Sequence, residues 1–336
     1  MSGVSASLMV EAGGPLVDRY LEFVKARARP NTVLAVASDL RVFFAVMPLA
    51  PTAVTTADVL AFIAEQRRPR GDGRVVRLSD GGSGLSARTI QRRLSTLSGL
   101  FSYLVMLEEM PANPVPRGLA TRRIRNRRGG GGVPLIRTPR TLPKVLEPDE
   151  VKALFKALRH HRDRAMVEAM VLGGLRRCEV LGLRFEDLRA GENRVFVADG
   201  KGGHQRFVHI SPRFFASVSA YVDSERPAEA KTDRVFVALK RPRRGQPLHD
   251  DGLDEIVTSA RRRAGLSHGT CHQLRHTCLT RLREAGMTLE SLQAQAGHRS
   301  IESTRLYLHL SNDWLAAEYL RAAALIDTAA TEAESA

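Results

Sequence analysis

Residues 272–307 read HQLRHTCLTRLREAGMTLESLQAQAGHRSIESTRLY. The fold must bring the basic and phenolic side chains of this stretch together. The stretch opens with a histidine and an arginine three positions apart, His272 and Arg275. It closes with a histidine and a tyrosine nine positions apart, His298 and Tyr307. Imidazole and guanidinium groups around a single phenol suit a bound phosphate, and they predict that the tyrosine is a nucleophile.

Two further basic residues lie upstream, Arg176 and Lys201. Cleavage of a phosphodiester requires that charge on the non-bridging oxygens is neutralised and that a proton reaches the departing oxygen. Arg176 and Arg275 suit the first task, because a guanidinium fork stays charged and donates two parallel hydrogen bonds. Lys201 lies in the glycine-rich turn 200–203, which is expected to bring its ammonium group to the leaving 5′-oxygen.

Tyr307 must be activated, because a phenol with a pKa of about 10 is only about 0.1% ionised at neutral pH. Nearby cations are expected to lower that pKa, and His272 is expected to accept the proton. The product is a covalent phosphotyrosine whose ester keeps the energy of the original bond, so a DNA hydroxyl can reseal the strand without ATP. This chemistry needs no cofactor, and the sequence has no P-loop. Tyr221 and Tyr319 compete for the role, and the spacing from His298 favours Tyr307.

The charge of the chain indicates the class of its partner. Lysine and arginine outnumber aspartate and glutamate by 51 to 36, and the formal net charge of +15 favours a polyanion such as nucleic acid. A composition set by a GC-rich genome is the alternative explanation. Three cysteines without a repeated spacing argue against a disulfide framework, and no signal peptide or membrane-spanning run is visible. We therefore expect a cytoplasmic, nucleoid-associated protein with no membrane partner.

The chain is long enough for two domains. Residues 117–144 hold nine basic residues, no acidic residue and a run of four glycines. Such a segment cannot build a core and reads as a linker, and its one-signed charge favours contact with a phosphate backbone over plain solubility. The expected organisation is a flexible N-terminus (1–14), a helical domain (15–116), the basic linker (117–144), a second domain (145–327) and a flexible tail (328–336).

Helical periodicity dominates the first domain, with helices expected over residues 31–47, 56–68 and 86–109. The last of these carries a buried stripe made of Ile90, Leu94, Leu97, Phe101 and Leu104. Arg88 and Arg92 fall on another face, where they are either ordinary surface residues or DNA contacts. The linker adds further candidates for DNA contact: Arg122, Arg123, Arg125, Arg127 and Arg128.

The second domain mixes helices with a small β-hairpin. The expected strands are 195–197 and 207–210, and the expected helices are 148–158, 164–172, 177–188, 212–223, 252–264, 271–284, 289–296, 303–308 and 313–325. The expected fold is therefore mainly α, with an all-helical first domain and a mixed α/β, mostly helical, second domain that holds a small sheet.

Two residues near the six candidates receive structural roles. Glu179 is expected to brace Arg176 or a neighbour on its own helix. His276 is interpreted as structural, although with His272 and the two cysteines of the same helix it suggests zinc. The helix periodicity places the cysteines and the histidines on different faces, so no metal site is expected.

In order and spacing, these motifs resemble the tyrosine recombinases, also called phage integrases, and the chain looks like a Xer-like two-domain member. The segment 174–183 (GLRRCEVLGL) resembles the first arginine box, 200–202 (GKG) the β-hairpin lysine, 272–277 (HQLRHT) the H-x-x-R box, and Gly297-His298 with Tyr307 the final histidine and nucleophile. Residues 31–43 and 85–114 resemble the core-binding domain, which in this family is SAM-like. An aromatic residue that is usual near Val36 is absent, and the insertion 69–84 is unusual.

The resemblance implies a site-specific recombinase that cuts DNA through a 3′-phosphotyrosine on Tyr307. Lys201 would be the general acid, and the phosphate would be held by Arg176, His272, Arg275 and His298. A core-binding and a catalytic domain would clamp the duplex, and the protein would be a monomer in free solution. Four copies would synapse two DNA sites and exchange strands through a Holliday junction, with room for accessory proteins, to integrate, excise or transpose a mobile element. The helix after Ser311 would dock on its own domain or on a neighbouring copy.

Two other functions use the same features. A non-catalytic DNA-binding regulator on this fold would be expected to have lost site residues, and none of the six is missing. A type IB topoisomerase shares the chemistry but relaxes DNA without synapsis, and the recombinase-like first half argues against it. The DNA sequence that is read depends on few side chains and on DNA shape, so these motifs do not name it.

Overall fold

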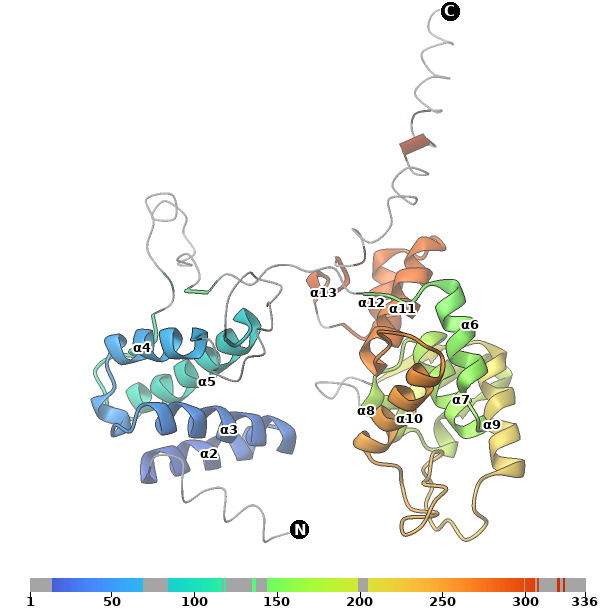
Figure 1. Ribbon diagram of the computed structural model, residues 1–336, viewed down its shortest axis with the longest axis horizontal. Coiled ribbons are helices and arrows are strands. Elements are labelled where there is room, and N and C mark those ends of the chain that lie inside the picture. Colours follow the sequence, from blue (N-terminus) through green and yellow to red (C-terminus); the bar gives the residue numbers. More distant parts are fainter. Residues whose placement is uncertain are drawn as a thin grey trace, which may run out of the picture. The chain divides into compact units, whose positions relative to one another are not determined.

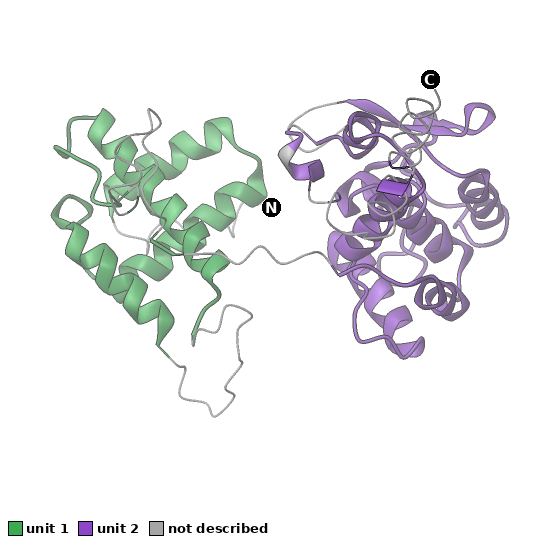
Figure 2. Ribbon diagram, turned by 90° about the horizontal axis from the view of Figure 1, so that it is seen from above, with its two compact units in different colours: residues 1–140 green, residues 141–336 purple. Residues whose placement is uncertain are grey.

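The computed structural model describes residues 14–68, 84–116, 118, 135–136, 144–198, 205–298, 300–305, 307, 319–320 and 323. The chain divides into two compact units, Met1–Arg140 and Thr141–Ala336, which are coloured separately in Figure 2. Lys201 and the expected linker contacts lie outside the described residues, as does most of the insertion 69–84.

Unit 1 is helical wherever it forms regular elements in the described ranges (Figure 1). Its elements are α2 (Pro15–Arg27), α3 (Pro30–Val46), the 3₁₀ turn η1 (Pro51–Ala53), α4 (Thr56–Arg67) and α5 (Ala87–Met106). The stripe predicted on α5 is buried, because Ile90, Leu97 and Leu104 are fully enclosed between this helix and its neighbours. The helical fold expected for this part of the chain is confirmed.

The helix starts of unit 1 are set by local capping, and two of them differ from the expected ones. Ser86 caps α5 as expected, since its hydroxyl accepts a hydrogen bond from the Thr89 amide over 3.2 Å. The cap of α4 is Thr55 rather than Thr56, because Thr55 and Asp58 form a reciprocal capping box. Helix α3 begins at a proline that occupies its first turn, so the expected caps at 31–32 lie inside the helix.

The expected linker contributes to the core of unit 1. Ile136 is 8% exposed within that core, and Leu135 packs against it. The expectation that this segment buries nothing is therefore wrong at these two positions. Their apolar side chains gain hydrophobic burial against the helices of this unit.

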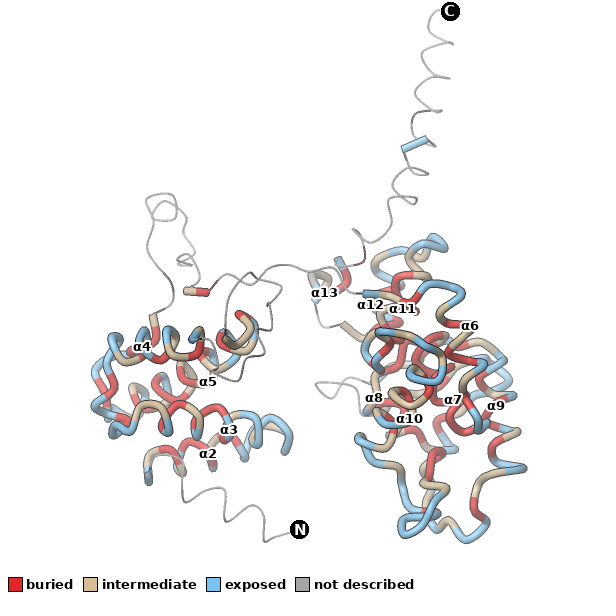
Figure 3. The backbone as a smooth tube through the Cα atoms, in the orientation of Figure 1, coloured by how far each residue is buried: buried red, intermediate tan, exposed pale blue. Residues whose placement is uncertain are grey.

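Unit 2 is built around α7 (His161–Val171), a helix that is buried over most of its length. Its helices are α6 (Pro148–Ala157), α7 (His161–Val171), α8 (Arg177–Gly182), α9 (Pro212–Ser224), α10 (Asp250–Arg263), α11 (Cys271–Glu284), α12 (Leu289–Ala296) and α13 (Glu302–Arg305). Every residue of α7 from Ala165 to Val171 is buried, and α9 and α11 pack against it (Figure 3). Close packing against this largely buried helix holds its neighbours in place, and one of them, α11, carries part of the candidate site.

A three-stranded antiparallel sheet in the described part of unit 2 has the order β1-β2-β3, with β1 (Leu188–Arg189), β2 (Arg194–Val197) and β3 (Arg206–His209). The expected hairpin is present, with Val195 opposite Val208. The helix expected over 177–188 is wrong beyond its first half, because α8 ends at Gly182. The next residues pair with another segment instead, since the Val235 amide donates to the Leu183 carbonyl over 2.9 Å. The remaining turns are η2 (Phe185–Asp187) and η3 (Ala190–Glu192).

Candidate active site

Helix α11 presents two basic rings and a guanidinium from adjacent turns. Thr270 caps the helix through a capping box with Gln273, which fixes where its first turn begins. Arg275 and His276 lie three and four positions after His272, and this spacing puts both on the same side of the helix as His272. Arg275 is only 2% exposed.

Arg275 is anchored by backbone carbonyls from two different segments. Its guanidinium donates to the Gly174 carbonyl and, over 2.6 Å, to the Ala296 carbonyl. Burial, followed by the charge of Arg176, lowers the pKa of this guanidinium to about 10. A cation held in a buried position at pH 7 is prepared to receive an anion.

Glu179 joins three guanidinium groups. Its carboxylate accepts from Arg176 Nη1 over 2.7 Å and from both terminal nitrogens of Arg206 over 3.0 Å, and it lies 3.9 Å from Arg275 Nη1. Burial raises the pKa of this carboxyl, but the hydrogen bonds and charges of Arg206 and Arg176 outweigh burial and lower the pKa to about 2. The predicted brace between Glu179 and Arg176 is confirmed, and it extends further than expected.

Arg206 is a residue that the sequence reasoning missed. It begins β3, and its Nε donates to the Gln295 carbonyl over 3.2 Å. Gln295 in turn donates to the His209 carbonyl over 2.7 Å, so the hairpin is tied to α12 at two points. The only sequence signal for Arg206 is its position just after the turn that carries Lys201.

His298 is positioned by the residues that follow α12. Gly297 ends the helix with φ +61°, and its carbonyl accepts from Arg176 Nη2 over 3.2 Å. Arg275 Nη2 lies 3.2 Å from His298 Nε2, and because a guanidinium only donates, the proton of the imidazole sits on Nδ1. Nδ1 then donates to Thr304 Oγ1 over 3.0 Å. Burial, followed by the charge of Arg275, lowers the pKa of His298 to about 4.

Tyr307 lies at the centre of these groups. It is 3% exposed and packs against residues of α11 and α12, and its ring stacks on His298 with centroids 6.3 Å apart and 6° between the planes. Its hydroxyl lies 2.7 Å from His276 Nδ1, and His276 Nε2 lies 2.9 Å from His272 Nε2.

Two expectations about Tyr307 are corrected. Its pKa was expected to fall, but burial raises it to about 12, against the opposing charge of Arg275. His276 was interpreted as structural, yet it is the ring that contacts the phenol oxygen. Its position four residues after His272 and next to Arg275 was the available signal, since this spacing selects the same helix side.

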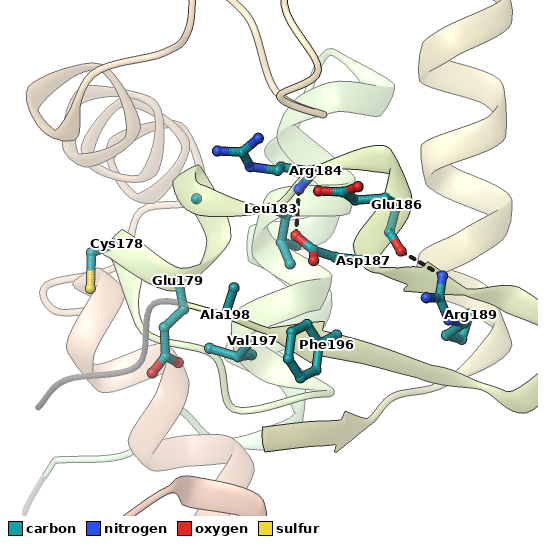
Figure 4. A pocket seen from close by; sticks show the side chains of 11 residues that line it. Cys178, Glu179, Leu183, Arg184, Glu186, Asp187, Arg189, Phe196, Val197 and Ala198 are labelled. Atoms are coloured by element: carbon teal, nitrogen blue, oxygen red, sulfur yellow. Dashed lines mark hydrogen bonds between the residues drawn. The ribbon is translucent and has the colours of Figure 1, made fainter. Parts of the chain in front are cut away.

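A cavity of 390 Å³ adjoins α8 and β2. Figure 4 shows Cys178 and Glu179 on one side of it, opposite Arg184, Glu186, Asp187 and Arg189. The polar residues on that opposite side bond among themselves, because the Arg184 amide donates to Asp187 over 2.8 Å. Arg184 forms an ion pair with Asp233, and Arg177 forms ion pairs with Asp250 and Asp254.

The remaining candidates are placed as follows. Arg88 is exposed on α5, while Arg92 forms an ion pair with the buried Asp39. Within the described ranges no group of three or more His, Cys, Asp or Glu side chains is arranged to hold a metal ion. The described helices include none with the length and apolar character needed to cross a membrane.

Comparison with known proteins gives both units relatives. Residues 144–313 match the model of the phage integrase family, and residues 17–107 match the phage integrase N-terminal SAM-like domain. The chain is 28% identical over 314 residues to tyrosine recombinase XerD of Listeria monocytogenes serotype 4b (strain F2365), covering 88% of this chain and 94% of that protein. It is 30% identical over 246 residues to tyrosine recombinase XerC of Bacillus pumilus (strain SAFR-032), covering 70% and 75%.

Solved structures share the fold. The Tn1549 transposon integrase in complex with transposon right end DNA has a TM-score of 0.67 at 17% identity, covering 92% of this chain and all of that one. A lambda integrase dimer bound to a COC' core site has a TM-score of 0.63 at 17% identity, covering 89% and 95%. The chain belongs to the phage integrase family and is a tyrosine recombinase, an enzyme of site-specific DNA recombination.

Proposed function

We propose that this protein cleaves and rejoins DNA strands at specific sites through a covalent 3′-phosphotyrosine on Tyr307. Arg176, Arg275 and His298 bind and stabilise the phosphate, and Lys201 protonates the departing 5′-oxygen. Four protomers synapse two duplexes and exchange strands through a Holliday junction, to integrate, excise or transpose a mobile element.

One observation carries the proposal: residues from distant parts of the chain converge on one phenol. Arg176 precedes α8, Arg275 and His276 lie on α11, and His298 follows α12. Arg176 and Arg275 are linked through Glu179, Arg275 bonds His298, and Tyr307 stacks on His298 and bonds His276. Buried guanidinium groups neutralise a phosphate more strongly than exposed ones, because water screens them less.

In the structure Arg275 donates to the Gly174 and Ala296 carbonyls and to His298 Nε2, while His298 Nδ1 bonds the Thr304 hydroxyl. A phosphate that enters the site competes for these donors with full negative charge, and charge-assisted hydrogen bonds are about twice as strong as neutral ones. The guanidinium groups therefore turn to the bound phosphate. The phosphorus atom of that phosphate then lies within reach of the Tyr307 hydroxyl.

The DNA site is sought by covalent capture. Wild-type protein is incubated with nicked duplexes whose arms are randomised, and DNA that stays attached in SDS is amplified and sequenced. We expect a recurrent site with wild-type protein and no attached DNA with Tyr307→Phe. An adduct that persists in Tyr307→Phe refutes the assignment of the nucleophile.

Two further assays separate the alternatives. Strand exchange between two duplexes that carry the captured site is expected from a recombinase. Relaxation of arbitrary supercoiled plasmid by a monomer, without exchange, indicates a type IB topoisomerase. Binding without any adduct indicates a regulator.

A further inference from the structure

A chain of hydrogen bonds leads from the buried phenol to solvent. Tyr307 Oη lies 2.7 Å from His276 Nδ1, and His276 Nε2 lies 2.9 Å from His272 Nε2. The two imidazole rings meet edge to face, with centroids 4.3 Å apart and 81° between the planes. Tyr307 is 3% exposed, whereas His272 lies on the surface, so this chain of hydrogen bonds runs from the buried part of the site to the protein surface.

The protons in this chain follow from donor and acceptor capacity. A neutral phenol has one proton to donate, and among the described residues His276 Nδ1 is its recorded acceptor. His276 then carries its own proton on Nε2 and donates it to His272 Nε2. This assignment points each donor outward, so one concerted shift moves a proton from the phenol to the exposed ring.

Burial and the charges around His276 keep this ring neutral. His272 and Arg275 face it from α11, and Arg176 and His298 belong to the same network from the segments beside it. Burial, and then the proximity of His272 and Arg275, lowers the pKa of His276 to about 4, so the ring is neutral at pH 7. A neutral imidazole accepts a proton, while a charge delivered to the exposed His272 is hydrated.

We propose that His276 is the catalytic base that deprotonates Tyr307 and passes the proton to His272; this rests on the proposed function. The Oη–H bond breaks while an N–H bond forms on His276 Nδ1, and the proton on His276 Nε2 moves to His272 Nε2. The freed electron pair on Oη attacks phosphorus, and the P–O5′ bond breaks as Lys201 supplies a proton to the leaving oxygen. His272 therefore acts one step away from the phenol.

The test separates basicity from hydrogen bonding. In His276→Gln the amide oxygen still accepts a hydrogen bond from the phenol but does not take up its proton, while His276→Ala leaves a space for added imidazole. The probe is the captured nicked duplex, cleaved in a single turnover, and His249→Gln, on the surface at the start of α10, is the matched control. We expect cleavage to fall about 100-fold or more in both His276 variants and to be unchanged in the control.

Three readouts identify a base. Cleavage by His276→Ala is expected to recover with imidazole, and cleavage by His276→Gln is expected to rise with pH where the wild-type rate is already level. A duplex with a bridging 5′-sulfur, which leaves without a proton, is expected to relieve Lys201→Ala and not His276→Gln. Restoration of His276→Gln by the 5′-sulfur, cleavage by His276→Gln within about threefold of wild type, or no response of either variant to imidazole and pH overturns the proposal.

Nitrogen-15 NMR of the wild-type protein without DNA keeps the proposal testable if both variants misfold. His276 is expected to be the Nε2–H tautomer, with an Nδ1 shift that changes in Tyr307→Phe. The proposal is overturned if His276 is the Nδ1–H tautomer and its nitrogen shifts do not change in Tyr307→Phe. Failure of the proposed function gives a different result, because wild-type protein would then form no adduct at all.

Discussion

At the scale of the residue, a single side chain, Glu179, balances part of the positive charge of the site. This fully enclosed carboxylate holds Arg176 and Arg206 and lies near Arg275. Its pKa in the folded protein is about 2, below the ordinary 4.5. A lowered carboxyl pKa contributes stability that is present above pH 4.5 and is lost as the pH falls through 2, and 2.5 pKa units correspond to about 3 kcal/mol.

Glu179→Gln is expected to lower the free energy of unfolding of unit 2 by about 3 kcal/mol at pH 7, and to flatten its dependence on pH between 4.5 and 2. Urea unfolding followed by circular dichroism at several pH values measures both effects. Asp149→Asn is the control, because its pair with Lys152 is exposed and screened by solvent, so a much smaller loss is expected. Equal losses in the two variants contradict the role given to Glu179.

Arg275 belongs to the same scale. Arg275→Lys keeps the charge but loses the fork that reaches both Gly174 and Ala296. We expect cleavage of the captured duplex to fall about 100-fold or more, with DNA binding retained. Arg281→Lys on the same helix, whose guanidinium bonds the Leu146 carbonyl, is expected to cleave at the wild-type rate. Wild-type cleavage by Arg275→Lys would show that charge alone is sufficient.

The sequence predicted individual residues better than their partners. Arg176, Arg275, His298 and Tyr307 were expected together, since residue type and order carry chemical meaning, and the structure gathers them. The contact between His276 and the phenol was not predicted, because it depends on how the segment after α12 returns to α11. The pKa of Tyr307 was misjudged for the same reason: burial is a property of packing, and a list of neighbouring charges does not contain it.

At the scale of the element, the end of α12 positions the site. Gly297 has φ +61°, and a Cβ added there would lie 2.8 Å from the Arg206 guanidinium. Gly297→Ala is therefore expected to displace Arg206, to lower the thermal midpoint of unit 2 and to slow cleavage. Gly265→Ala is the matched control, because it has φ +70° with nothing within 4 Å and carries only the backbone cost of about 1 kcal/mol. Equal cleavage by the two variants would contradict this role of Gly297.

Elements were predictable where local patterns agree with packing. The bounds of α11 and α12 match the expected 271–284 and 289–296, because caps and apolar spacing point the same way. Residues 183–188 were expected to be helical, since their apolar spacing continues that of α8. Pairing of Leu183 with Val235, which is distant in sequence, decides the matter instead.

At the scale of the whole molecule, the net charge of +15 predicts DNA binding that weakens steeply with salt. Changing Arg122, Arg123, Arg125, Arg127 and Arg128 to glutamine is expected to reduce the slope of log K against log salt by up to about 4.5, equally for all DNA sequences. A control removes the same charge from exposed positions of unit 2, by changing Lys231, Lys240, Arg241, Arg243 and Arg244. Equal slopes in the two variants would contradict linker contact with DNA.

The central claim is that Tyr307 carries the DNA, and mass spectrometry of the trapped adduct tests it most directly. After nuclease trimming, trypsin is expected to release the peptide 306–321, which contains both Tyr307 and Tyr319. Fragment ions distinguish the two positions. A nucleotide mass on Tyr307 is the result we predict, and a nucleotide on Tyr319, on Tyr221 or on no tyrosine would contradict the account.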